Sequence, residues 1–194
     1  MPANQELRPI TDAKTILAVY YQDWRLSSSG ELNLIVAAWD DGRILWSDDR
    51  LKGGPPYRGA QIGASRVNEL LSRLDEDGLF DIDFLSHPHF GPDTEFKTIF
   101  LNASGKQLKM ESSHELVEEK GGIVREYGTV SDKRPRFEVL RREPNDYLFY
   151  RFVWAEIRGR ALSLIPPCGD TIHGELIVTK PGVISWQDRS EPQH

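Results

Sequence analysis

Residues 39–59, which read WDDGRILWSDDRLKGGPPYRG, constrain the fold more than any other stretch of the chain. Asp40-Asp41-Gly42 is a hairpin signal, because an Asp-Gly pair tolerates the positive φ that tight turns require. It joins two segments rich in apolar residues, 31–39 and 43–47. The pattern predicts two adjacent antiparallel strands, with Trp39 and Trp46 near the two ends of the hairpin.

The segment that follows, residues 48–63, contains the run Gly53-Gly54-Pro55-Pro56. Such a run predicts an irregular, shaped loop that crosses the edge of the sheet rather than regular structure. The segment lacks the Gly-Lys-Ser/Thr ending of a phosphate-binding P-loop. Tyr57 and Arg58, at the predicted tip of this loop, are the residues expected to face a ligand.

A helix over about residues 65–77 is predicted next, because apolar residues recur there at helical spacing. These residues are Val67, Leu70, Leu71 and Leu74. Ser65 is the expected N-cap, and Gly78 suits the left-handed position just after the helix. The acidic run 75–77 lies at the negative end of the helix dipole, which favours a cation or a basic partner beside it.

The remaining elements complete an α+β fold. Residues 15–24 are apolar on both faces, which predicts an inner strand covered on both sides. Residues 146–158, followed by Gly159, are aromatic enough to suit a strand as well, but we favour a helix. Further strands are predicted at 95–101, 106–112, 136–140, 175–179 and 183–186. We therefore expect a mainly antiparallel sheet of hairpins, with two principal helices at about 65–77 and 146–158 packed on it.

Length and composition indicate one soluble domain. The chain has 194 residues, and we expect a single domain over 14–187 with flexible segments at 1–13 and 188–194. No run is long and apolar enough for a membrane span, and residues 1–14 do not have the pattern of a signal peptide. Cys168 is the only cysteine, so no internal disulfide is possible and a cytoplasmic location is expected.

The formal net charge of −6 argues against nucleic acid as a partner, because that binding requires a cationic surface. The charge is uneven, however: residues 120–160 hold 10 Lys and Arg against 6 Asp and Glu. This basic region either covers an acidic face of the same domain or binds a partner protein or a second copy of the chain.

The segment Asp81–His89 is the strongest candidate for a metal site. If it is extended, Asp81, Asp83, His87 and His89 share one side, and two histidines at i and i+2 can hold one divalent metal together with carboxylates. The alternative is a solvated acidic loop with exposed imidazoles.

Cys168 is a second candidate for chemistry. A cysteine nucleophile requires a nearby base, which His173 or His114 could supply. The alternative is a half-buried small residue after the turn Pro166-Pro167.

Three functions follow from these patterns. The sequence carries no catalytic signature, so the first is a non-enzymatic binding or protein-interaction domain, with no cofactor, in which exposed aromatic residues line a sheet face. The second is a metal-dependent hydrolase that uses the segment Asp81–His89. The third is a structural subunit that self-associates through residues 120–160. The chain resembles no family closely enough to transfer site residues from it.

Overall fold

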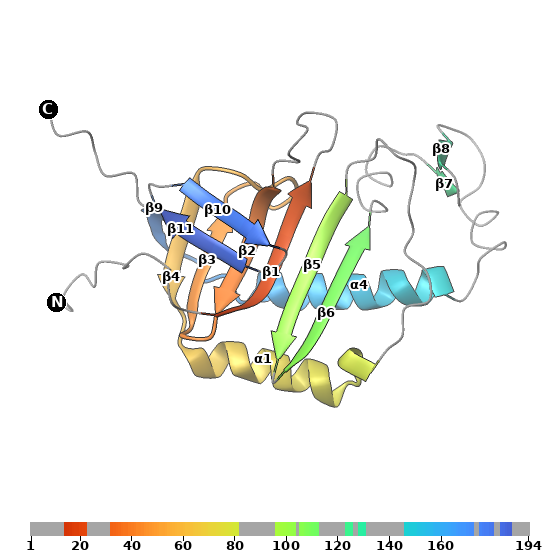
Figure 1. Ribbon diagram of the computed structural model, residues 1–194, viewed down its shortest axis with the longest axis horizontal. Coiled ribbons are helices and arrows are strands. Elements are labelled where there is room, and N and C mark those ends of the chain that lie inside the picture. Colours follow the sequence, from red (N-terminus) through yellow and green to blue (C-terminus); the bar gives the residue numbers. More distant parts are fainter. Residues whose placement is uncertain are drawn as a thin grey trace, which may run out of the picture.

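The structure is a computed structural model. It describes residues 14–22, 32–81, 96–103, 105–112, 123–125, 128–130, 146–172, 175–180 and 183–187. Its centre is a seven-stranded sheet in the order β6-β5-β1-β2-β3-β4-β9, in which all neighbouring strands are antiparallel (Figure 1). The strands are β1 (Thr15–Gln22), β2 (Leu32–Trp39), β3 (Arg43–Ser47), β4 (Tyr57–Gln61), β5 (Phe96–Ala103), β6 (Lys106–Ser112) and β9 (Asp170–Ile172).

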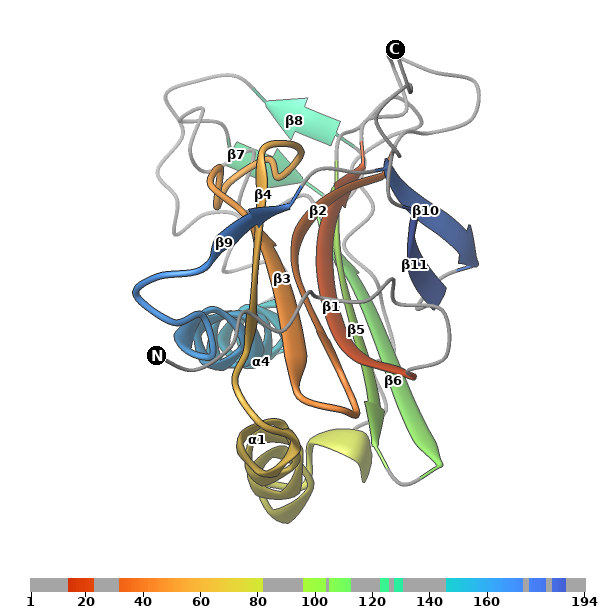
Figure 2. The ribbon, with the colours of Figure 1, turned by 90° about the vertical axis from the view of Figure 1, so that its left-hand side faces the viewer.

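Two helices, α1 (Ala64–Glu76) and α4 (Asp146–Ser163), lie on one face of this sheet, and a 3-10 turn at Leu79–Asp81 follows α1. A separate hairpin, β10 (Glu175–Lys180) with β11 (Val183–Gln187), lies on the opposite face, as Figure 2 shows. A small pair, β7 (Ile123–Arg125) with β8 (Gly128–Val130), completes the described elements. The predicted α+β fold with an antiparallel sheet and two helices is confirmed.

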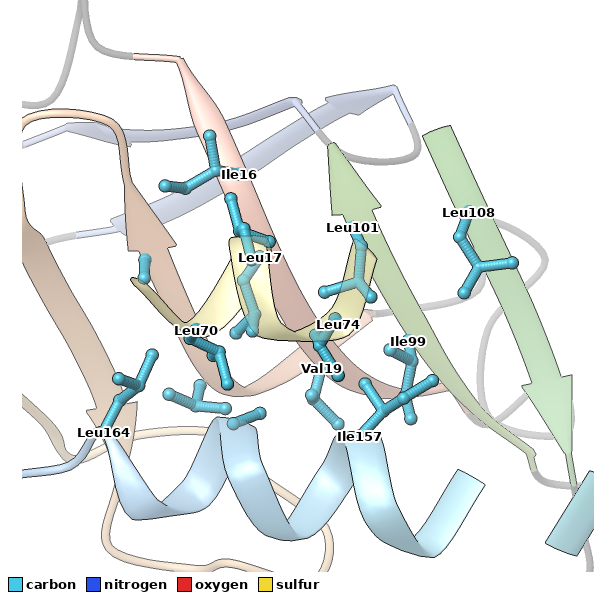
Figure 3. Close-up of a cluster of buried hydrophobic side chains, with 14 of the residues drawn as sticks. Ile16, Leu17, Val19, Leu70, Leu74, Ile99, Leu101, Leu108, Ile157 and Leu164 are labelled. Carbon is cyan, nitrogen blue, oxygen red and sulfur yellow. The ribbon is translucent and has the colours of Figure 1, made fainter. Parts of the chain in front are cut away.

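The main core lies between the sheet and the two helices (Figure 3). The apolar stripe of α1 is buried there, as its spacing predicted. Ile157 and Leu164 enter the same core from α4 and the turn that follows it. Each such side chain contributes about 1.5–3 kcal/mol when it is fully buried. The sheet contributes the rest, including Leu17, Val19, Ile99 and Leu101.

A second apolar cluster lies on the opposite face of the sheet. Its largest member is Trp39, and it includes Tyr20 and Tyr57. Because β1 stands between β5 and β2 and sends side chains into both clusters, residues 15–21 are all buried. The prediction of an inner strand covered on both sides is therefore confirmed.

The short strand β4 departs from the sequence expectation. Residues 57–61 form β4, so the prediction that segment 48–63 contains no regular structure is wrong for this part. β4 has no apolar run, because its centre reads Arg58-Gly59-Ala60. Its strand form comes instead from backbone pairing with β3 on one side and β9 on the other, which is invisible in a local pattern.

The ends of α1 show one correction and one confirmation. The N-cap is Gly63, which makes no side-chain cap hydrogen bond, so the prediction that Ser65 caps this helix is wrong. Gly78 has the predicted left-handed backbone at the other end. The acidic C-terminal turn of α1 forms ion pairs with cations of the same chain. Lys106 Nζ lies 2.8 Å from Asp75, and Arg160 lies 2.8 Å from Asp77.

The second helix is longer than predicted, since α4 continues past Gly159 to Ser163. A Cβ added at Gly159 would meet no atom of the described residues within 4 Å. We therefore expect Gly159→Ala to stabilise the protein by about 0.5–1 kcal/mol, because alanine loses less backbone entropy in a helix. Urea denaturation measures this change. A loss of stability would instead indicate that the helix ends before Gly159.

Several predictions fall outside the described residues. The segments 1–13 and 188–194 and the strand at 136–140 are among them, and a single domain over 14–187 stays a prediction. In the described part of the chain, no helix combines the length and apolar character needed to cross a bilayer.

Candidate functional site

A loop of residues 48–56 joins β3 to β4 at the end of the sheet opposite the Gly42 turn, and internal hydrogen bonds fix its shape. Asp49 Oδ1 accepts the N–H groups of Leu51 at 2.8 Å and Lys52 at 2.9 Å. The buried hydroxyl of Ser47 accepts the Asp49 N–H and donates to the Gly54 carbonyl. The loop therefore has a defined conformation, and the prediction of a shaped loop holds for it.

The same loop contacts three neighbouring elements, β2, α4 and β1. The Gly54 N–H donates to the carbonyl of Leu34 in β2 at 3.1 Å. Arg158 of α4 donates from Nη2 to the carbonyl of Arg50 at 3.1 Å. Lys52 Nζ lies 6.0 Å from the centre of the Tyr21 ring of β1, within cation–π range. The loop thus crosses from β3 over β2 towards β1, on the face that carries α4.

Two arginines and one aspartate gather beside Trp46, and we call Asp48, Arg50 and Arg58 the arginine site. Arg50 lies over the Trp46 ring, with its Cζ 5.8 Å from the ring centre. Arg58 faces the same side of the sheet as Trp46, because the two residues are paired in the β3–β4 ladder. Arg58 Nε donates to Asp48 Oδ1 at 2.8 Å, and Arg58 Nη2 donates to Oδ2 at 3.3 Å.

Charge is unbalanced in the arginine site. The hydrogen bond from Arg58 lowers the pKa of Asp48, and the charges of Arg58 and Arg50 lower it further. Burial lowers the pKa of Arg50, and the like charge of Arg58 adds to this effect, while Asp48 opposes it. Arg50 Nη1 is buried and has no hydrogen-bond partner among the described residues. Among the described residues, two guanidinium groups thus share one carboxylate.

A fully buried lysine lies near the same loop. Lys97 of β5 has no exposed surface. Hydrogen bonds from the N–H groups of Lys52 and Leu51 lower the pKa of Asp49, and the charges of Lys52 and Lys97 also lower it. Lys97 therefore lies close enough to the loop for its charge to act on Asp49.

The lowered pKa values predict how this loop responds to acid. A carboxylate whose folded pKa is depressed stabilises the folded form above its unfolded pKa, and this contribution is lost as the pH falls through the folded pKa. We expect Asp48 and Asp49 to titrate below the usual aspartate range, and the loop to loosen only when they protonate. Carboxyl carbon shifts in an NMR pH titration measure both effects. Titration of both groups at ordinary values would contradict the hydrogen bonds described here.

The two predicted ligand-facing residues lie on opposite faces of β4, because side chains alternate along a strand. Arg58 is about half exposed and belongs to the arginine site. Tyr57 is only 6% exposed and packs in the cluster around Trp39, and burial raises its pKa. A ligand role for either residue stays a prediction.

Of the four predicted metal ligands, only Asp81 lies within the described residues. It is exposed, and one of its oxygens lies 3.7 Å from Lys106 Nζ. Asp83, His87 and His89 lie outside the described residues. The part of the chain that is described contains no group of three or more His, Cys, Asp or Glu residues suited to a metal ion. The metal site stays a prediction.

Cys168 is an exposed free thiol just before β9. Both bases considered for it, His114 and His173, lie outside the described residues, so its reactivity is untested. Its neighbour Gly169 packs against the Trp46 ring so closely that a Cβ there would overlap ring atoms. The segment thus helps to enclose the tryptophan beneath the arginine site.

Two arginines of the basic region 120–160 make contacts within the chain. Arg160 pairs with Asp77 of α1, and Arg158 holds the 48–56 loop. For these two residues the contacts favour the interpretation that the basic region packs on its own domain. A partner at residues 120–145, most of which lie outside the described residues, stays a prediction.

The three tryptophans whose burial the structure describes do not form an exposed binding surface. Trp39, Trp46 and Trp154 are all at most 2% exposed. Trp24 lies outside the described residues. These three side chains are therefore part of the core, and the charged groups of the 48–56 loop are the exposed feature beside them.

A comparison of the chain with protein-family models and with curated proteins finds no match. The candidate site therefore rests on the geometry of the described residues.

Proposed function

We propose that this protein is a non-enzymatic binding domain whose ligand is an anion held at the 48–56 loop. The observation that carries the proposal is the arginine site, where two guanidinium groups lie beside one carboxylate among the described residues, in a chain whose formal net charge is −6. Unlike the exposed pairs elsewhere on the surface, this site includes a buried guanidinium nitrogen, Arg50 Nη1, that has no hydrogen-bond partner among the described residues.

The fixed shape of the loop supports the same proposal. A ligand site gains affinity when its groups are ordered before binding, because less conformational entropy is then lost. Here the loop is hydrogen-bonded to β2, β3 and α4, and it carries Arg50, while Arg58 lies on the adjoining strand β4. A cytoplasmic location remains part of the proposal, in keeping with the single cysteine Cys168.

The test uses thermal unfolding with two anionic probes, inorganic phosphate and citrate, each compared with chloride at equal ionic strength. A probe at ten times its dissociation constant stabilises the folded protein by about 1.4 kcal/mol, which raises the melting temperature by roughly 3–6 °C. We expect this rise with at least one probe. It should vanish in the double variant Arg50→Met and Arg58→Met.

The matched control is Arg73→Met. Arg73 is exposed on α1 and pairs with Glu69, so its loss changes the net charge without touching the loop. This variant should respond to the probes as the unmodified protein does. If neither probe raises the melting temperature, or if the double variant responds equally, the anion site does not exist.

A further inference from the structure

The Asp48 carboxylate occupies the place on Arg58 that an external anion would take. Its two oxygens accept from Nε and Nη2 of Arg58, which is the two-point geometry that guanidinium groups offer to carboxylates and phosphates alike. Asp48 is exposed, with 44% of its side chain accessible, so it can leave Arg58 without opening the core. Arg50 lies nearby with a donor that Asp48 does not fill.

A ligand must compete with Asp48 for Arg58, and this requirement determines which chemical class of ligand can bind. Asp48 is attached to the chain and is therefore present at Arg58 at a high effective concentration. A free monocarboxylate offers the same two oxygens and the same single charge, so it gains nothing by replacing Asp48. A phosphate group carries about −1.5 to −2 charges near neutral pH and three strong acceptor oxygens, so it can serve Arg50 and Arg58 together.

We propose that Arg50 and Arg58 bind a phosphate-type oxyanion, and that this anion displaces the Asp48 carboxylate from Arg58. The proposal rests on the proposed function and specifies its ligand class. Asp48 then acts as an internal competitor. It keeps Arg58 in place when the ligand is absent, and it raises the ligand concentration that is needed for binding. The oxyanion could be free phosphate or the head of a phosphomonoester, since both present the same oxygens.

Calorimetric titration at pH 7.5 and constant ionic strength tests this proposal. The probes are inorganic phosphate, glycerol 3-phosphate and acetate. We expect both phosphates to bind the unmodified protein, and acetate to bind at least about ten times more weakly. Asp48→Asn should tighten phosphate binding by about ten-fold, because the competing charge is removed. Arg58→Met should weaken it by a similar factor. Tighter binding of glycerol 3-phosphate than of phosphate would identify a phosphomonoester as the ligand, and the reverse would identify free phosphate.

Asp41→Asn is the matched control. Asp41 is exposed and is the acidic partner of Arg43, so this variant makes the same chemical change and the same change in net charge. It should leave phosphate binding unchanged. If it tightens binding as much as Asp48→Asn does, the effect is one of net charge and the proposal is wrong.

The proposal is also wrong if Asp48→Asn binds phosphate no more tightly than the unmodified protein, or if Arg58→Met binds it equally well. These failures differ from a failure of the proposed function. If citrate still stabilises the protein through Arg50 and Arg58 while phosphate does not bind, the anion site stands but its ligand class is different. If no anion binds at all, both proposals fail.

Discussion

Replacing Gly42 with alanine is expected to destabilise the protein by about 3 kcal/mol or more. Gly42 has φ of +83°, which costs an alanine about 1–2 kcal/mol. In addition, the turn lies against the start of α1, where the Gly42 carbonyl accepts the N–H of Ile62 at 2.9 Å. A Cβ would overlap the backbone of Gly63 and Ala64, and backbone atoms cannot move aside as a flexible side chain can. Chemical denaturation with a two-state fit gives the free energy of unfolding.

Gly105→Ala is the control for this prediction. Gly105 has a similar φ of +86° in the β5–β6 turn, but a Cβ there would meet no atom of the described part of the chain within 4 Å. The free energy of unfolding of this variant should therefore fall by only about 1–2 kcal/mol, which is the backbone cost alone. If the two variants lose equal stability, the close contact between the Gly42 turn and α1 is not present in solution.

Trp46→Ala should have a similarly large effect, a loss of about 3–5 kcal/mol in the free energy of unfolding. The ring is 2% exposed in the main core and is also the platform beneath Arg50. The variant should lose phosphate binding as well, since Arg50 would no longer be held beside Arg58. Chemical denaturation and calorimetric titration measure the two effects.

Arg50→Met separates these two roles of the tryptophan. It removes the cation–π contact, worth about 0.5–1 kcal/mol at a partly exposed position, and leaves the core intact. We expect a small loss of stability and a large loss of anion binding. If Trp46→Ala costs less than about 1 kcal/mol, the ring does not fill the core as described.

The parts of the fold that follow from local signals could be predicted from the sequence. The Asp-Gly turn at Gly42 predicted the β2–β3 hairpin, and the spacing from Val67 to Leu74 predicted α1 and its buried face. β4 could not be predicted in this way, because its residues form a strand only through pairing with strands on both sides. The N-cap of α1 was missed for a similar reason: tertiary contact with the Gly42 turn, rather than Ser65, fixes the start of the helix.

The candidate site could be predicted only in part. Arg58 was identified by its position beside the Gly-Pro run. Arg50 was missed because it stands in a charged run, which resembles a solvated segment, and only the folded loop brings it over Trp46. Lys97 was missed because a lone lysine in a strand is ordinarily exposed; its burial depends on elements distant in sequence. The one signal in the sequence was the two-residue alternation along β5, which places Lys97 at an inward-facing position.

The measurement that tests the central claim most directly is an NMR titration with inorganic phosphate at constant ionic strength, followed through backbone amides and arginine Nε–H groups. We predict saturable shifts at residues 47–58 and at the Nε–H groups of Arg50 and Arg58, with one dissociation constant for all of them. The Nε–H group of Arg73 on α1 should not shift. The absence of saturable shifts in the loop, or shifts of equal size at Arg73, would contradict the assignment of an anion site to this loop.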